Sequence, residues 1–252
     1  MIAVILAGGK GTRLAEIAKD VPKPLVSIHG KPILQYQIEN LKRSGIDRVI
    51  LVVGYQGHKI KAFFGNGAAL GVSIDYYHEE SPLGTAGAFY YLKERLPEDF
   101  LVIYGDLVFD VDFIKFIAFH KKNNALCSLM VHPNDHPHDS DIIVQNNLGI
   151  VQSILKKNTP REGYYSNNVN AGIILLNKQG LNSCEQAKKQ DLEVDLILPL
   201  LASQRVFGYK TSEYIRDMGT PERFKKVQEH LFQGVVHKRS MVNKQKDRKS
   251  VV

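Results

Sequence analysis

The chain has 252 residues, of which 44% are hydrophobic and 23% charged, so it can bury a sizeable core in one large α/β domain. It contains no apolar run near the ~20 residues that a membrane-spanning helix needs, and Met1 leads directly into a strand-like run without a basic leader. These features predict a cytoplasmic protein with no membrane partner.

The net charge of +7 is concentrated near the carboxyl terminus. From His237 to Val252 there are six basic residues and one acid, so the rest of the chain carries only +2. A nucleic-acid-binding segment would gain from aromatic side chains that stack on bases, and none follows Phe232. We therefore expect residues 237–252 to be a disordered tail or a linker, and we expect no nucleic-acid partner.

Strands and helices alternate along the first half of the chain. Buried strands are predicted at Ile2–Leu6, Arg48–Val53, Val72–Tyr77 and Phe100–Tyr104, and helices at Pro32–Arg43, Gln56–Phe64 and Gly84–Leu96. The alternation predicts an α/β fold, a Rossmann-like and mostly parallel sheet with helices on both faces. Because ligands bind at the carboxyl ends of such strands, the loops that begin at Ala7, Glu79 and Gly105 should converge on one site.

The pattern changes after residue 123. Strands are predicted at Ala125–His132 and Asn170–Leu176, a hairpin at Asp139–Leu155 and a closing helix at Pro221–Phe232. We expect residues 124–236 to form a smaller lobe that faces residues 1–123, both within one domain of residues 1–236.

A glycine-rich loop follows the first predicted strand. It reads Leu6-Ala7-Gly8-Gly9-Lys10-Gly11-Thr12-Arg13-Leu14. Glycines let the backbone approach a ligand closely, and their N–H groups can bind phosphate beside a helix N-terminus. The spacing fits neither a P-loop nor a dinucleotide-binding fingerprint, because Leu14 replaces the third glycine of the latter. A flexible turn is the alternative, and the two cations Lys10 and Arg13 favour phosphate binding.

Three further residues suit a phosphate or a metal ion. Lys23 lies between two prolines, whose fixed φ angles present its charge on a stiff segment. Asp106 directly follows a predicted strand, where it can hold Mg²⁺, an ion that usually takes one or two carboxylates plus phosphate oxygens. Asp217 is the best candidate for the second carboxylate, and a turn residue before Pro221 is the alternative for it.

Together these motifs resemble the sugar-nucleotide pyrophosphorylases, the sugar-1-phosphate nucleotidyltransferase family. Leu6–Leu14 resembles the LAGGxGTRL loop of that family, Lys23 lies in a PKPL box, and Gly105-Asp106 resembles the metal-binding GD. Val169–Ile173 resembles the NAG strand of the sugar pocket, and Asp217–Pro221 resembles the segment with the second metal aspartate. The five matches occur in the family's order and extend from Ile2 to about Phe232.

The resemblance implies an in-line transfer without a protein nucleophile. An oxygen of a sugar 1-phosphate attacks the α-phosphorus of a nucleoside triphosphate and pyrophosphate leaves, a step that depends on positioning and charge. The implied catalytic residues are Arg13, Lys23 and Asp106, and Asp106 and Asp217 would hold Mg²⁺. The implied nucleotide-binding residues are Leu6, Ala7, Gly8, Gly9, Gly11, Thr12, Arg13, Glu80, Gly84 and Thr85.

The resemblance also divides the domain into two halves. Residues 1–123 would bind the nucleotide and residues 124–236 the sugar. Sugar-phosphate contacts are implied for Lys157, Asn170 and Gly172. Lys157 matches the lysine of the family's EKP motif, whereas Lys156 and Asn158 replace its Glu and Pro, so the glutamate that normally contacts the sugar is missing at this position.

Two segments bear on the choice of substrates. Glu79–Gly87 resembles the EPLGTAG segment of guanylyl-transferring members, which favours GTP, with Glu80 or backbone groups reading the guanine edge. The same segment could also be a helix entry capped by Thr85. His132–Asp141 resembles the HPNDHPxDSD stretch of D-glycero-α-D-manno-heptose 1-phosphate guanylyltransferases. Prolines interrupt it, so we interpret it as a polar loop at the edge of the sugar pocket and not as a metal site.

Other functions remain open at this point. A mannose or glucose 1-phosphate nucleotidyltransferase would carry the same motifs, and so would a regulatory homologue that no longer turns over. The presence of Arg13, Lys23, Asp106 and Asp217 favours an active enzyme. The expected partners are a nucleoside triphosphate, GTP in preference, and a sugar 1-phosphate, and a homo-oligomer is compatible with the sequence.

Overall fold

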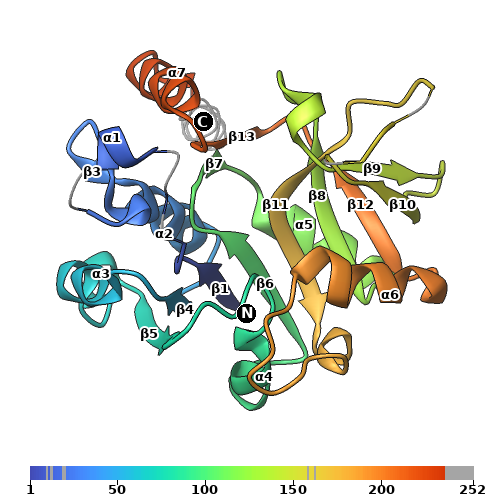
Figure 1. Cartoon of the computed structure of the whole chain (residues 1–252), viewed down its shortest axis with the longest axis horizontal. Helices are drawn as coiled ribbons and strands as arrows, with labels where there is room; N and C mark the ends of the chain where they lie inside the picture. Colours follow the sequence, from blue (N-terminus) through green and yellow to red (C-terminus); the bar gives the residue numbers. More distant parts are fainter. Residues whose placement is uncertain (10, 12–13, 19–20, 158, 162, 236–252) are drawn as a thin grey trace, which may run out of the picture.

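A computed structural model describes residues 1–235 except 10, 12–13, 19–20, 158 and 162. The basic segment 237–252, predicted to be a tail or linker, lies outside the described residues. The centre of the structure is a nine-stranded sheet (Figure 1). Its parallel part consists of β1 (Ile2–Leu6) between β4 (Arg48–Val53) and β6 (Asp99–Tyr104), with β5 (Ser73–His78) beside β4.

The same sheet continues into the second half of the chain. β11 (Val169–Asn177) pairs antiparallel with β6, and the remaining strands gather around β11. They are β8 (Cys127–His132), β9 (Ile142–Gln145), β10 (Val151–Leu155) and β12 (Val206–Lys210). The antiparallel pair of β9 and β10 confirms the predicted hairpin. The two halves of the chain therefore contribute strands to one sheet, and the strands of the second half form its mixed part, which has both parallel and antiparallel pairs.

Helices cover both faces of the sheet, as predicted. One face packs against α2 (Ile33–Arg43), α3 (Gly57–Phe64) and α5 (Phe113–Lys122). In α2, Leu34, Ile38 and Leu41 are fully buried at helical spacing. The other face packs against α4 (Ala88–Leu92) and a π-helix, Leu192–Ile197, which continues into α6 (Leu198–Leu200).

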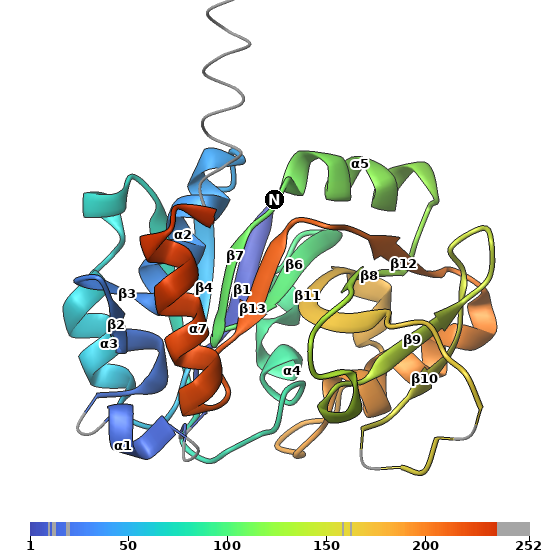
Figure 2. The same cartoon turned by 90° about the horizontal axis from the view of Figure 1, so that it is seen from above.

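The last described elements of the chain return to the first half (Figure 2). β13 (Tyr214–Asp217) pairs antiparallel with β7 (Leu107–Asp110), and α7 (Pro221–Phe232) follows it. Phe224 and Val227 of α7 share a core with Leu14 beside α1 (Ala15–Ala18) and with the hairpin of β2 (Ser27–Ile28) and β3 (Lys31–Pro32). Asp217, the second predicted metal ligand, is the last residue of β13 and is thereby brought next to the first half of the chain.

Most predicted elements are confirmed to within a few residues, and one helix is shorter than predicted. The helix predicted at Gly84–Leu96 contains only α4 and the 3₁₀ turn Lys93–Arg95. Gly84 instead forms an isolated bridge with Gln190, and the N-cap of α4 is Gly87 and not Thr85. The other 3₁₀ turns of the described residues are Lys23–Leu25, Ala68–Leu70, Pro137–Asp139, Lys178–Leu181 and Leu201–Ser203. Among the described residues, no helix is both long and apolar enough to cross a membrane.

Candidate active site

A cavity of about 620 Å³, the larger cavity, opens at the carboxyl ends of the parallel strands. Ala7, Glu79 and Gly105 are the first residues after β1, β5 and β6, and all three line it. The convergence expected from the topology is therefore present. The lining also includes most of the predicted nucleotide-binding residues, namely Leu6, Gly8, Gly9, Gly11, Gly84 and Thr85.

The glycine-rich loop gives the larger cavity a wall of bare backbone. A Cβ on Gly8 would lie 2.9 Å from Glu79 Oε2, and Gly11 has a φ of +62°. A side chain at Gly8 would displace the Glu79 carboxylate, and one at Gly11 would be strained by the positive φ, so glycine at both positions keeps bare backbone at the cavity, where its N–H groups can bind a phosphate. The predicted residues Thr12 and Arg13 lie outside the described residues.

An ion pair joins two of the residues predicted to be catalytic. Lys23 Nζ lies 2.6 Å from Asp106 Oδ2, and the lysine side chain is 13% exposed. The 3₁₀ turn that begins at Lys23 follows Pro22, whose φ of −64° and ψ of 145° are extended. The stiff presentation of Lys23 expected from the sequence is thus present, and its charge lines the larger cavity.

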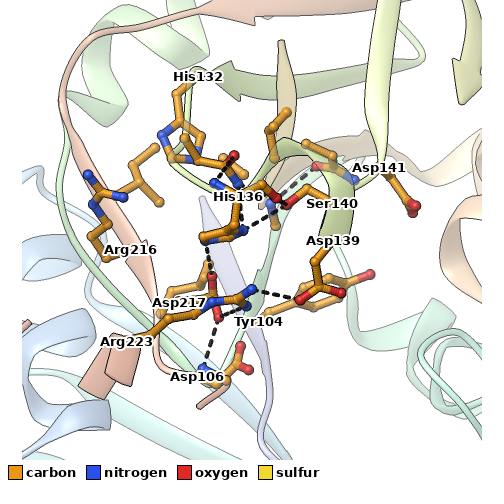
Figure 3. Close-up of a pocket in the computed structure, with 18 of the residues that line it drawn as sticks. Tyr104, Asp106, His132, His136, Asp139, Ser140, Asp141, Arg216, Asp217 and Arg223 are labelled. Atoms are coloured by element: carbon orange, nitrogen blue, oxygen red, sulfur yellow. Dashed lines mark hydrogen bonds and ion pairs between the residues drawn. The ribbon is translucent and has the colours of Figure 1, made fainter. Parts of the chain in front are cut away.

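A second cavity of about 270 Å³, the smaller cavity, adjoins the first (Figure 3). The two share Tyr104, Asp106, Asp141, Lys157, Glu193 and Gly219. The smaller cavity also contains the predicted residues Asn170, Gly172 and Asp217. Residues expected to bind the sugar phosphate and the metal are therefore brought together from distant parts of the sequence.

A bulge in β11 shapes one wall of the smaller cavity. The register of β11 against β8 shifts between Asn170 and Ile174. Within the bulge, Gly172 has a φ of +71°, and a Cβ there would lie 2.8 Å from the ring of Tyr104. Asn170 Oδ1 accepts the Gly172 N–H, and its Nδ2 donates to Glu193 Oε1 at 3.1 Å. Bulges often re-aim side chains beside active sites, and this one points the Asn170 amide at a buried carboxylate.

Asp217 is held by groups from α7 and from the loop of residues 132–141. Arg223 Nη1 and the Gly219 N–H each donate to Oδ1 at 2.9 Å, and His136 Nε2 lies 3.3 Å from Oδ2 (Figure 3). Arg223 also donates to Asp139 at 2.6 Å. Burial raises the pKa of Asp217, but the hydrogen bond and charge of Arg223 outweigh it and lower that pKa. The carboxylate is therefore ionised near neutral pH.

The two aspartates fit a divalent cation that arrives with a substrate. Asp106 and Asp217 line the same cavity, and the Met218 N–H donates to the Asp106 backbone oxygen at 3.0 Å. Carboxylate oxygens suit Mg²⁺, which takes one or two of them together with phosphate oxygens and water. Within the described part of the chain, no group of three or more His, Cys, Asp or Glu could hold a metal ion. Substrate phosphates would thus have to complete the coordination.

Several lysines surround the boundary between the cavities. Lys157 lines both, and its backbone N–H donates to Asp141 Oδ1 at 2.9 Å. Lys156 Nζ donates to the other oxygen, Asp141 Oδ2, at 2.6 Å. Lys189 lines the larger cavity together with Lys23. Cations from separate segments make the boundary well suited to a polyphosphate chain.

The loop of residues 132–141 lines the smaller cavity through His132, Asn134, His136, Asp139, Ser140 and Asp141. Burial, followed by the positive charge of Arg216, lowers the pKa of His132 to about 4. His132 is therefore neutral at physiological pH. The loop is also tied to α7 and β13 by ion pairs of Asp135 with Arg216 and Lys226.

Among the described residues, one predicted residue is not brought to the site, and sequence reasoning missed several residues that line it. Glu80 is exposed and does not line either cavity, whereas its neighbour Glu79 lines the larger one. Tyr104 and Glu193 line both cavities. Glu79 had a signal in the sequence, because it is the first residue after its strand, like Ala7 and Gly105. The sequence contained no signal for Glu193, because only the packing of the folded chain brings it to the cavity.

The chain matches the family model "Nucleotidyl transferase" over residues 2–234. It is 32% identical over 234 residues to the D-glycero-alpha-D-manno-heptose 1-phosphate guanylyltransferase of Aneurinibacillus thermoaerophilus, covering 92% of this chain and 98% of the relative. It is 31% identical to the mannose-1-phosphate guanylyltransferase of Mycobacterium tuberculosis, again over 92% of this chain but only 65% of the relative's length.

Solved structures agree with this assignment. The crystal structure of HddC from Yersinia pseudotuberculosis aligns with a TM-score of 0.78 at 28% identity, covering 91% of this chain and 99% of that one. The same protein complexed with GMP-PN aligns with a TM-score of 0.76 at 29% identity over the same shares of the two chains. With the cavities, the motifs and these similarities combined, the chain belongs to the nucleotidyl transferase family of enzymes.

Proposed function

We propose that this enzyme transfers a guanylyl group from GTP to D-glycero-α-D-manno-heptose 1-phosphate, giving the nucleotide sugar and pyrophosphate in a Mg²⁺-dependent reaction. The observation that carries the proposal is the pair of adjoining cavities, which share Asp106 and Lys157 at their boundary. A triphosphate in the larger cavity and a sugar phosphate in the smaller one would meet at this boundary. The similarity to the A. thermoaerophilus heptose enzyme over 98% of its length supports the choice of sugar.

Glu79 supports the choice of guanine. Its Oε1 is buried without a hydrogen-bond partner among the described residues, and burial raises its pKa against the opposing effect of a Leu83 backbone hydrogen bond. A buried carboxylate is stabilised by ligand groups that donate hydrogen bonds. Guanine offers two adjacent donors, N1–H and the N2 amino group, which match the two oxygens of one carboxylate.

The reaction then follows from charge and position. An oxygen of the sugar phosphate forms a bond to the α-phosphorus while the bond to the bridging oxygen breaks, and pyrophosphate leaves with the electron pair. Lys23, with Arg13, stabilises the charge on the phosphates, and Lys157 holds the sugar phosphate. A divalent cation held by Asp106 and Asp217 would supply further neutralisation of phosphate charge when bound. We place this chemistry in the cytoplasm as part of the same proposal.

A mannose 1-phosphate guanylyltransferase is the second candidate. It is favoured by the 31% identity to the M. tuberculosis enzyme, of which this chain spans 65%. The two candidates share the nucleotide and differ only in the sugar, so a single panel separates them.

The test measures pyrophosphate release with GTP, UTP, CTP and dTTP, each combined with heptose, mannose and glucose 1-phosphates, with Mg²⁺ or with excess EDTA. We expect the highest kcat/KM for GTP with the heptose phosphate and none of this activity in EDTA. Glu79→Gln should raise the KM for GTP and leave the KM for the sugar phosphate unchanged. The absence of turnover in every combination would refute the proposed function, and a clear preference for mannose 1-phosphate would establish the second candidate.

A further inference from the structure

Five carboxylates line the smaller cavity, and they differ in how they are neutralised. They are Asp106, Asp139, Asp141, Glu193 and Asp217. The four aspartates form ion pairs with a lysine or an arginine: Lys23, Arg223, Lys156 and again Arg223, respectively. Within the described part of the chain, Glu193 has no ion pair. Among the described residues, Glu193 is therefore the carboxylate of this cavity that forms no ion pair with a lysine or an arginine.

Glu193 is nevertheless deeply buried and firmly oriented. The whole residue Glu193 is 6% exposed. The Tyr104 hydroxyl donates to Oε1 at 2.7 Å, and Asn170 Nδ2 donates to the same oxygen at 3.1 Å. No donor among the described residues contacts Oε2. Burying a carboxylate is costly unless its oxygens accept hydrogen bonds, so one half of this group is satisfied and the other half is ready for a ligand.

The backbone that carries Glu193 is fixed from two directions. Glu193 lies in the first turn of the π-helix Leu192–Ile197, whose N-cap Asp191 accepts the Val194 N–H. The preceding residues pair with residues 83–86: the Leu192 N–H donates to Thr85 Oγ1 at 2.7 Å. π-Helical turns occur frequently at functional sites. The carboxylate is thus held in place before a substrate arrives, which is what selective recognition requires.

We propose that Glu193 is a specificity-determining residue that accepts hydrogen bonds from ring hydroxyls of the sugar phosphate through Oε2. This inference rests on the proposed function, because it assigns a partner for Glu193 within the sugar site. The ligand class is a polyhydroxylated sugar 1-phosphate, whose hydroxyls are donors that an acceptor-only carboxylate can distinguish from hydrogen. The phosphate end is anchored elsewhere, at Lys157, so Glu193 reads the ring and not the charge.

The test is Glu193→Gln, assayed with GTP and heptose 1-phosphate. Glutamine keeps the shape and one acceptor oxygen for Tyr104 and Asn170, and it replaces the second acceptor with a donor. We expect the KM for the sugar phosphate to rise by about 10- to 100-fold, the loss expected for a hydrogen bond to a charged group. The KM for GTP should change by less than about twofold, because the assignment gives Glu193 no nucleotide contact.

Deoxy sugars identify the interaction itself. The unaltered enzyme should discriminate against at least one of the 2-, 3- and 4-deoxy forms of heptose 1-phosphate, and Glu193→Gln should lose most of that discrimination, because the group that reads the missing hydroxyl is gone. Glu193→Asp, which keeps the charge but shortens the side chain, should show the same selective loss. Asp112→Asn is the matched control: it removes a buried carboxylate at the N-cap of α5, away from both cavities, and retains a capping residue.

The outcomes separate the two levels of the argument. If Glu193→Gln has an unchanged sugar KM and unchanged discrimination among the deoxy forms, Glu193 does not read the sugar. Equal rises in both KM values, or a fall in melting temperature with normal kinetics for the folded fraction, would assign it a structural role and also overturn the proposal. Absence of turnover in the unaltered chain would instead refute the proposed function, and the assignment of Glu193 with it.

Discussion

Replacement of Gly84 by alanine tests the contact between the loop of residues 83–86 and the segment before the π-helix. Gly84 has a φ of +78°, and a Cβ there would lie 2.2 Å from the Gln190 carbonyl oxygen and 3.0 Å from its carbon. Both obstacles are backbone atoms, so no side-chain rotation relieves the collision. The Ala86 N–H donates to Gln190 and the Gln190 N–H donates to Leu83, each at 3.0 Å, and these bonds oppose a separation of the two segments.

The expected loss of stability follows from two costs and one smaller opposing gain. A positive φ costs an alanine about 1–2 kcal/mol, and forcing extra atoms into a packed site costs about 1–3 kcal/mol, whereas the stiffer unfolded chain returns about 0.4–1 kcal/mol. We expect Gly84→Ala to lower the free energy of unfolding by about 2–4 kcal/mol. Gly30→Ala is the matched control, because Gly30 has a φ of +79° and nothing within 4 Å of its Cβ position.

The assay is urea denaturation of both variants, with the midpoint and the m-value compared, together with initial rates at saturating and limiting sugar phosphate. Gly30→Ala reports the cost of the positive φ alone, at about 1 kcal/mol. Because Glu193 lies three residues after Gln190, any shift that relieves the Gly84→Ala collision should also raise the KM for the sugar. The reasoning would be refuted if Gly84→Ala were no less stable than Gly30→Ala and had the same kinetics.

Four other predictions use different parts of the chain. If Lys23 stabilises phosphate charge, Lys23→Met should lower kcat/KM by a factor that corresponds to a loss of about 2–4 kcal/mol of transition-state stabilisation, with little change in stability. Asp106→Asn should abolish Mg²⁺-dependent pyrophosphate release. Loss of stability alone in either variant would point to a structural role. Because the folded-state pKa of His132 is lowered to about 4, its contribution to stability, roughly 3 kcal/mol at most, is present above pH 6.5 and lost as the pH falls towards 4. Denaturation of His132→Gln across this range should show a smaller loss than the unaltered chain, and an identical loss would contradict the assignment. Removal of residues 238–252 should leave turnover unchanged, since α7 already ends at Phe232. A large loss of activity with the fold intact would show that these residues reach the active site or a neighbouring subunit.

The sequence predicted those features that depend on neighbouring residues. The glycine-rich loop, the Lys23 segment and Asp106 each follow a strand or a proline within a few positions, and local patterns therefore located them. The choice between Glu79 and Glu80 failed because successive side chains beside a strand point to opposite sides, and the end of β5 had to be known to the residue. Resemblance to a motif identified the segment and not the side chain that enters the cavity.

Features that depend on distant packing were not predictable. The helix expected at Gly84–Leu96 is shortened because residues 83–86 bond to Gln190, more than 100 positions away. The short strands β7 and β13 have too few residues for an alternating pattern to identify them, and they pair only because the chain returns after β12. Glu193 lies in an unremarkable stretch of acidic and aliphatic residues, and only the folded chain brings it beside Tyr104.

The pairing of residues 83–86 with Gln190–Leu192 has a consequence for changing what the enzyme accepts. The loop beside Glu79 and the segment that leads to Glu193 are hydrogen-bonded as one unit. A chimera that exchanges residues 79–87 with those of a relative of different base preference would therefore leave its new loop against a mismatched backbone. Exchange of residues 188–193 in the same step would keep the two surfaces matched. Base and sugar preference are thus expected to be inherited together in this chain, and a library that varies one segment alone would sample mostly impaired proteins.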